Sequence, residues 1–231
     1  DLMKVAGLHR MQNIGIQNAP MTTFFSLTSP FVIGKTKHGA GIRFMNDRFG
    51  LFTNQSFHIQ YSYRQPLGKG FLNIGLEGGF MNLSEMQSSY FRQDDPAVPS
   101  ALKSDMKFDL GAGIYYSTST WWVGGSYSHL TRPIAELDME NSKSASVKVV
   151  GTMYVVGGYH FRLKHHKEWQ LTPSAMVMSD FRSWDANVTL MCDYKDRYRW
   201  GLGYRILGSV NVLVNIDIIN GLSIGYTGEI P

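Results

Sequence analysis

The stretch from Ser56 to Phe80 reads SFHIQYSYRQPLGKGFLNIGLEGGF, and it decides the fold class. In its first half, apolar or aromatic residues at 57, 59, 61 and 63 alternate with polar ones. Residues 66–70 (PLGKG) have the composition of a turn, and the alternation then resumes with Leu72, Ile74 and Leu76. A period of two on both sides of a turn predicts an antiparallel hairpin with one apolar and one polar face.

Each arm of this hairpin is about ten residues long, which exceeds the roughly five or six residues of an ordinary soluble strand. It matches the roughly 9–11 residues that a tilted strand needs to cross a membrane. The charged residues Arg64 and Glu77 fall on the polar face. This pattern is typical of a transmembrane β-barrel, although a soluble sandwich could contain a similar hairpin, so the rest of the chain has to decide.

Composition favours the barrel. The 231 residues contain 13% aromatic residues and 24 glycines, both suited to a barrel wall with aromatic girdles. No run of about 18 apolar residues occurs, which excludes a membrane-spanning helix but not a barrel. No change in composition separates two halves, so we expect one domain over residues 1–231. The single cysteine, Cys192, excludes an internal disulfide framework and a cysteine-based zinc cluster.

The formal net charge of +4 is spread over turns and alternate strand positions. A nucleic-acid-binding protein would concentrate lysine and arginine in a patch or a run. No such run is found, and we expect no nucleic-acid partner.

The same alternation predicts thirteen strands. Besides the two arms of 56–80 they cover residues 3–10, 22–31, 38–45, 108–116, 121–130, 149–162, 169–178, 184–194, 198–207, 210–217 and 222–227. Bacterial single-chain barrels have an even number of strands. We therefore expect a fourteenth strand after Pro231.

The predicted connections alternate in length. Those after even-numbered strands are mostly short, whereas long polar loops are predicted at 46–54, 82–106 and 131–148. Short periplasmic turns opposite long extracellular loops are typical of an outer-membrane barrel, and a soluble sandwich has no such parity. The tryptophans begin or nearly begin strands, where aromatic rings gather at membrane interfaces; they are Trp121, Trp122, Trp169, Trp184 and Trp200.

Charged side chains recur on the predicted polar faces. The set expected to form a lumen network is Arg43, Arg64, Glu77, Asp109, Asp185, Arg205 and Asp217, and His58, His160 and Arg162 share these faces. Unpaired buried charge is costly, so a structural network of paired ions is one interpretation. A polar channel or a ligand-binding lumen is the other.

Few residues suggest chemistry. A lipid-cleaving barrel needs a serine activated by a histidine, but Ser128 and His129 are adjacent and point to opposite faces of a strand. His165 and His166 lie in a basic turn, and Asp94 and Asp95 lack the spaced ligands of a calcium loop. No glycine-rich phosphate loop occurs. The sequence thus predicts no catalytic residue, cofactor or metal site.

Several segments together resemble the PorP/SprF family of outer-membrane proteins of the type IX secretion and gliding machinery. They are NAPMTTFFSLTSPF (18–31), KHGAGIRFMNDRFGLFTNQS (37–56), YSYRQPLGKGFLNIGLEGGF (61–80), FDLGAGIYYS (108–117), WVGGSYSHL (122–130), LTPSAMV (171–177) and WGLGYR (200–205). The most specific part is the His-Gly-x-Gly strand followed by Asn-Asp-x-x-Gly. Its residues carry over only as a structural signature: His38, Gly39, Gly41, Asn46, Asp47 and Gly50. On physical grounds, Gly39 and Gly41 would allow a tight strand, and Asn46 and Asp47 would begin a loop.

The resemblance implies a non-enzymatic component in the outer membrane of Bacteroidota-type cells, surrounded by outer-membrane lipid. It implies periplasmic and outer-membrane subunits of the secretion machinery as partners, and secreted adhesins as cargo. The predicted loops 82–106 and 131–148 are the expected contact regions, with mobile surface loops as the alternative. The rival function is an outer-membrane pore or a transporter of small hydrophobic molecules, and an outer-membrane enzyme is the third class.

Overall fold

The computed structural model describes residues 2–16, 18–50, 52–85, 104–138, 144–163, 166–206 and 208–230. Its regular structure in these ranges consists of strands. They are β1 (Lys4–Met11), β2 (Met21–Ile33), β3 (Thr36–Phe49), β4 (Phe52–Leu67), β5 (Gly70–Glu85), β6 (Ser104–Ser117), β7 (Trp121–Ser128), β8 (Ile134–Asp138), β9 (Ser144–Lys148), β10 (Thr152–Tyr159), β11 (Phe161–Arg162), β12 (Trp169–Ser179), β13 (Trp184–Tyr194), β14 (Tyr198–Arg205), β15 (Ser209–Ile219) and β16 (Leu222–Ile230).

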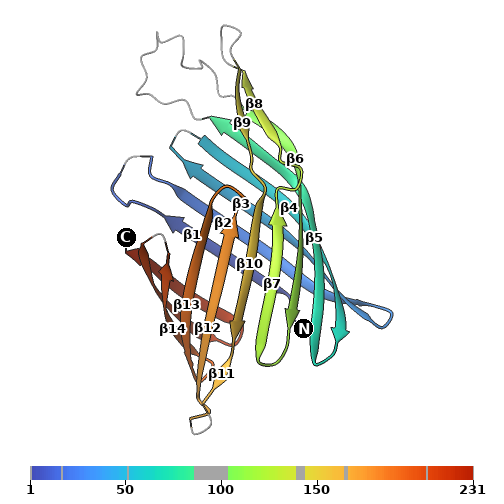
Figure 1. Ribbon diagram of the computed structural model, residues 1–231, viewed down its shortest axis with the longest axis vertical. Helices are drawn as coiled ribbons and strands as arrows, with labels where there is room; N and C mark the ends of the chain where they lie inside the picture. Colours follow the sequence, from blue (N-terminus) through green and yellow to red (C-terminus); the bar gives the residue numbers. More distant parts are fainter. Residues whose placement is uncertain are drawn as a thin grey trace. The chain divides into compact units, whose positions relative to one another are not determined.

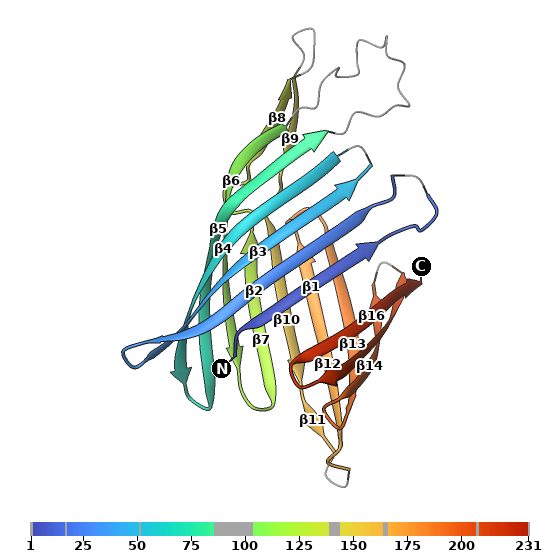
Figure 2. The ribbon, with the colours of Figure 1, turned by 180° about the vertical axis from the view of Figure 1, so that it is seen from behind.

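The main sheet has fourteen strands, and they pair in chain order apart from the excursion through β8 and β9 (Figures 1 and 2). The path β1-β2-β3-β4-β5-β6-β7-β10-β12-β13-β14-β15-β16 corresponds to the thirteen predicted strands. The predicted strand 149–162 is divided after Tyr159, and its last part, β11, pairs with β12 off this path. The predicted all-β, antiparallel fold is confirmed. Among the described residues, no helix has the length and apolarity to cross a membrane.

The chain divides into two compact units. The first comprises Asp1–Arg64, Ile74–Ala112 and Ser128–Gly151, and the second comprises Gln65–Asn73, Gly113–Tyr127 and Thr152–Pro231. The boundaries between them fall inside β4, β5 and β6 and at the end of β7. The single barrel domain therefore stays a prediction, and each unit is described by itself.

Alternation along the strands gives each unit an apolar and a polar face. In β4, Phe57, Ile59 and Tyr61 are exposed, whereas His58 between them is fully buried. In β15 of the second unit, Val212 and Val214 are exposed and their neighbours are partly covered. Successive side chains of a strand point to opposite sides of a sheet, so the period of two in the sequence becomes this separation of faces.

The loop predicted at 46–54 is wrong. Strand β3 continues to Phe49 and β4 begins at Phe52, so Asn46 lies opposite Gln55 and Asp47 lies opposite Asn54 inside the ladder. Residues 46–54 carry polar side chains on both faces of the strands, so they show no alternation of apolar and polar residues. The turn is confined to the connection that contains Gly50, whose φ of +58° belongs to the left-handed region that glycine adopts at little cost.

The loop predicted at 131–148 is also wrong in part, because it contains a second, two-stranded sheet. Strand β8 pairs with β9 from Ile134 opposite Lys148 to Asp138 opposite Ser144. Figure 1 shows this hairpin extending beyond the start of β6, which lies in the first unit. Strands of five residues are too short to give a clear periodic signal. Of the other long loop, residues 82–85 belong to β5 and 104–106 to β6, and residues 86–103 lie outside the described residues.

We expect Gly79→Ala to destabilise the protein by about 1–3 kcal/mol, as overpacked sites do. An added Cβ would overlap the carbonyl oxygen of Phe57 and lie 2.7 Å from the Cα of His58. The backbone of β4 would have to move away from β5. Urea unfolding of the refolded protein in detergent measures the change in the free energy of unfolding.

Gly125→Ala is the matched control, because its Cβ would make an ordinary contact of 3.7 Å with the Tyr154 carbonyl oxygen. Its effect should stay below about 0.5 kcal/mol. Equal losses from both substitutions would contradict the close approach of β4 and β5.

Candidate functional site

A network of charged and polar side chains lies on the polar face of the first unit. Arg43 in β3 is directly opposite His58 in β4, and Glu77 follows in β5. Arg43 Nη2 donates to Glu77 Oε1 at 2.9 Å, and Gln60 Nε2 donates to Glu77 Oε2 at 2.9 Å. Both carboxylate oxygens of Glu77 therefore have a donor. Charge-assisted hydrogen bonds of this kind are stronger than neutral ones.

Asp109 in β6 is the most deeply buried charged group of this network, with 1% of its surface exposed. Its Oδ2 accepts from His58 Nε2 at 3.2 Å and from His129 Nδ1 at 2.7 Å. Its Oδ1 accepts from the hydroxyl of Thr131 at 3.2 Å. A buried carboxylate is tolerated when it is paired and hydrogen-bonded, and three donors meet this need.

His58 connects the two acidic residues. Arg43 Nη2 lies 3.4 Å from its Nδ1, while its Nε2 faces Asp109. An arginine can only donate, so Nδ1 is the acceptor and the ring proton belongs on Nε2. Both ring nitrogens of His58 are therefore engaged by side chains of the network.

The network also holds the base of the β8–β9 hairpin. His129 and Thr131 lie in the connection between β7 and β8, where His129 and Arg132 adopt positive φ values of 58° and 45°. The Thr131 hydroxyl also contacts the Phe108 carbonyl oxygen at 3.1 Å. Asp109 thus fixes two residues of the bend from which the hairpin starts.

The second unit has its own ion pairs on the polar face. Arg205 Nε donates to Asp185 Oδ2 at 2.5 Å, and its Nη1 lies 3.7 Å from Glu229. Ser209 donates to Glu229 at 2.7 Å. Nearer the other ends of the same strands, Arg199 pairs with Asp217, which also accepts from Ser223 at 2.5 Å. Arg205–Asp185 and Arg199–Asp217 join neighbouring strands, whereas Arg205–Glu229 connects β14 to β16 across β15.

The structure brings together two pairs of the predicted network, Arg43 with Glu77 and Asp185 with Arg205. Asp109 and Asp217 instead pair with residues outside the predicted set, His129 and Arg199. Arg64 lies opposite Lys37 in the β3–β4 ladder. His58 could have been chosen from its place in the alternation. His129 was predicted inside the strand 121–130, but β7 ends at Ser128, so His129 lies in the bend that follows and its contact with Asp109 could not be read from the alternation.

The motif residues have varied surroundings. His38 lies on the apolar face, where its Nδ1 contacts the Tyr61 hydroxyl at 2.7 Å and its ring stacks on Phe31. Added Cβ atoms would lie 2.7 Å from the Ser62 hydroxyl at Gly39 and 2.9 Å from the Leu27 carbonyl oxygen at Gly41. In strand β3, Asp47 accepts a hydrogen bond from the Thr22 hydroxyl at 2.6 Å, next to Asn46.

Other candidate positions offer little for chemistry. In the described ranges, no group of three or more His, Cys, Asp or Glu residues is arranged to hold a metal ion. Asp94, Asp95 and His165 lie outside the described residues. The arrangement at Asp109 is suited to holding strands and a hairpin together.

A double-mutant cycle should detect strong coupling between Arg43 and Glu77. Arg43→Met and Glu77→Met should each lower the free energy of unfolding by about 2 kcal/mol, because each leaves a partly buried charge without its partner. The double variant should lose at least about 1 kcal/mol less than the sum. Chemical unfolding in detergent provides all four values.

The exposed pair of Lys195 and Glu168, 3.9 Å apart, is the control cycle. Its coupling should be under about 0.5 kcal/mol. Additive effects at Arg43 and Glu77 would mean that this ion pair does not stabilise the fold.

Asp109→Asn should loosen the β8–β9 hairpin. An amide cannot accept from two ring N–H groups and a hydroxyl as a carboxylate does, so hydrogen exchange in residues 134–138 and 144–148 should speed up about tenfold. Exchange in β13–β15 should not change. Unaltered protection of the hairpin would show that Asp109 does not hold it.

No curated protein and no solved structure matches the chain. A sequence model of the family described as the type IX secretion system membrane protein PorP/SprF matches residues 1–231. The match covers the whole chain, including the strands that carry both sets of ion pairs. The chain belongs to the PorP/SprF family of type IX secretion system membrane proteins.

Proposed function

We propose that this membrane component of the type IX secretion system is a non-enzymatic β-barrel of the outer membrane that binds other subunits of the machinery or secreted adhesin cargo. The observation that carries the proposal is a sheet with an exposed apolar face and a polar face of paired charges. The apolar face is suited to contact with lipid. On the polar face, the charges are balanced by one another and do not require a ligand.

The apolar face supports contact with lipid. In β14, Leu202 is 61% exposed, and in β4, Ile59 is 62% exposed. Exposed apolar patches of more than a few hundred square ångströms are rare on soluble monomers and mark surfaces that meet a partner or a membrane. Strand β4, with 16 residues, is long enough to cross a bilayer when it is tilted.

The barrel itself is part of the proposal. We propose one barrel domain over residues 1–231, built from the strands of the main sheet. Short turns such as the one at Gly68 would then face the periplasm, and the β8–β9 hairpin would face the cell exterior.

The polar face supports a scaffold in preference to an enzyme or an open pore. The arrangement of Arg43, His58 and Asp109 places each charge against a partner, and His58 uses both of its ring nitrogens. Paired charges of this kind hold neighbouring strands in register. A rigid wall is what a subunit needs when it presents loops to a partner.

The β8–β9 hairpin is the proposed contact element. It is regular structure within the predicted contact region 131–148, and its base is held by Asp109 through His129 and Thr131. Holding a binding element in one direction lowers the conformational entropy that binding would otherwise cost. The other predicted contact region, 82–106, remains part of the proposal.

The proposal predicts that partners are lost when the hairpin is removed. Residues 134–148 can be replaced by a Gly-Ser-Gly linker, because the Pro133 carbonyl oxygen accepts from the Val149 amide at 2.9 Å and the ends therefore meet. Tagged protein is purified from native membranes in mild detergent, and co-purifying chains are identified by mass spectrometry. Machinery subunits present with the parent chain should fall at least about tenfold, equivalent to 1.4 kcal/mol of binding free energy.

Replacing 180–183, the connection between β12 and β13, by Gly-Ser-Gly-Ser is the control and should leave the partners in place. Folding of every variant is checked by its heat-modifiable migration in gels. Unchanged partners without the hairpin would contradict its role. Recovery of the parent chain alone, with ion conductance in bilayers, would favour the pore.

A further inference from the structure

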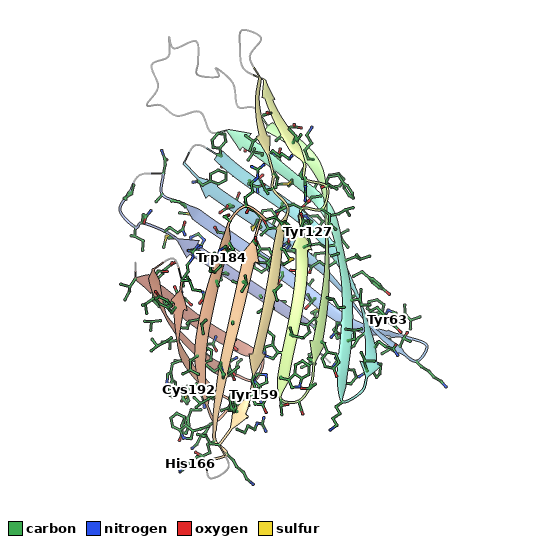
Figure 3. All side chains as sticks on the ribbon, viewed as in Figure 1. Tyr63, Tyr127, Tyr159, His166, Trp184 and Cys192 are labelled. Carbon is green, nitrogen blue, oxygen red and sulfur yellow. The ribbon has the colours of Figure 1, made fainter. Side chains whose placement is uncertain are left out.

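A cluster of aromatic rings lies in the second unit, where β12 begins, β13 ends and β14 begins. Trp169 lies opposite Tyr194, and Trp200 lies opposite Cys192 in the next ladder. The ring centres of Trp169 and Tyr194 are 4.7 Å apart, and those of Trp169 and Trp200 are 5.7 Å apart. These rings share the apolar face with Cys192, which Figure 3 labels at the same end of the unit as Tyr159 and His166.

Two cations lie directly beyond these rings, in the turn between β13 and β14. Lys195 Nζ is 5.2 Å from the centre of the Tyr194 ring, and the guanidinium carbon of Arg197 is 5.7 Å from the centre of the Tyr198 ring. The Arg197 side chain is further fixed by donation from its Nε to the Asp217 carbonyl oxygen at 3.2 Å. Both positive groups are thus held at the edge of an aromatic surface.

The turn backbone is unusual for the residues it contains. Lys195 and Asp196 have φ values of +56° and +52°, and the Arg197 amide donates to the Tyr194 carbonyl oxygen at 3.1 Å. Two central residues with positive φ define the hairpin turn in which Asn-Gly is the preferred pair. A lysine with positive φ is unfavourable, so the backbone alone does not explain Lys195 here.

The acidic residues near the β13–β14 turn do not neutralise its two cations. Glu168 is 3.9 Å from Lys195, and both side chains are more than half exposed, which makes a weak pair in water. A hydrogen bond with Tyr194 and the charge of Glu168 raise the pKa of Lys195 above its ordinary value. Lys167 is a third cation nearby in sequence, and Asp196 is the acid of the turn itself. Asp193 and Asp217 lie close by, and both are paired with Arg199.

We infer that the β13–β14 turn is a binding site for the headgroup of an anionic phospholipid. Trp169, Tyr194 and Trp200 would lie at the level of the headgroups, where amphipathic rings gather. Lys195 and Arg197 would contact the phosphate of a lipid seated against these rings. The inference rests on the proposed function, because it requires that the apolar face of β12–β14 is covered by lipid.

The experiment compares lipid binding by the refolded full chain and by the variant Lys195→Gln/Arg197→Gln. The protein is refolded in detergent, and bound lipid is counted by native mass spectrometry with phosphatidylglycerol or phosphatidylcholine as the probe. The parent chain should bind phosphatidylglycerol about tenfold more tightly than phosphatidylcholine, since cations near a membrane surface attract anionic headgroups. The double variant should bind the two lipids within about twofold of each other.

The control variant Lys69→Gln/Arg182→Gln removes two cations from other turns and should keep the tenfold preference. Excess inorganic phosphate should not displace the lipid, because free phosphate has no contact with the rings. Equal lipid preference in the parent chain and in the double variant would overturn the inference, as would loss of the preference in the control.

Insertion is measured separately, by protease protection of each variant in vesicles of phosphatidylcholine alone. The parent chain and both variants should insert equally. Failure of the parent chain to insert would count against the proposed barrel, whereas insertion without a lipid preference would count against the headgroup site only.

Discussion

Successive side chains of an extended strand point to opposite sides of a sheet, so every strand of this protein has to suit two surroundings at once. Strand β15 shows the consequence, with exposed Val210, Val212 and Val214 on one side and the partly covered Asn211 on the other. A shift of one residue in any ladder would exchange the two faces. The apolar surface, the polar network and the order of pairing all depend on keeping this register.

Ion pairs on the polar face contribute to that register. Arg43 and Glu77 join β3 to β5 on either side of β4, and Arg205 joins β14 to Asp185 in β13. A slipped strand would leave one of these charges without its partner, which costs more than the intact pair contributes. The pairs therefore act mainly against wrong registers. Keeping the strands in register is thus one role that these charges have in the fold.

Asp109 shows how one buried group can connect a wall to a loop. Its carboxylate accepts from His58 in the wall and from His129 and Thr131 at the base of the β8–β9 hairpin. The hairpin has only five residues in each strand, and an isolated two-stranded sheet is marginally stable in water. Its attachment to β6 through Asp109 is the physical reason for which we propose it as a contact for a partner.

The sequence by itself determined the strands, their two faces and the family. The strands and their faces follow from an alternation with a period of two residues, and the family follows from contiguous motifs. Thirteen strands were found in this way, and two predicted loops were wrong where the pattern was polar on both faces or only five residues long. Only the tertiary structure decided which charges pair. His58 and Asp109 are 51 positions apart, and His129 lies just past the end of β7, although the predicted strand 121–130 included it. Their meeting depends on the registers of several ladders together, which no local pattern records.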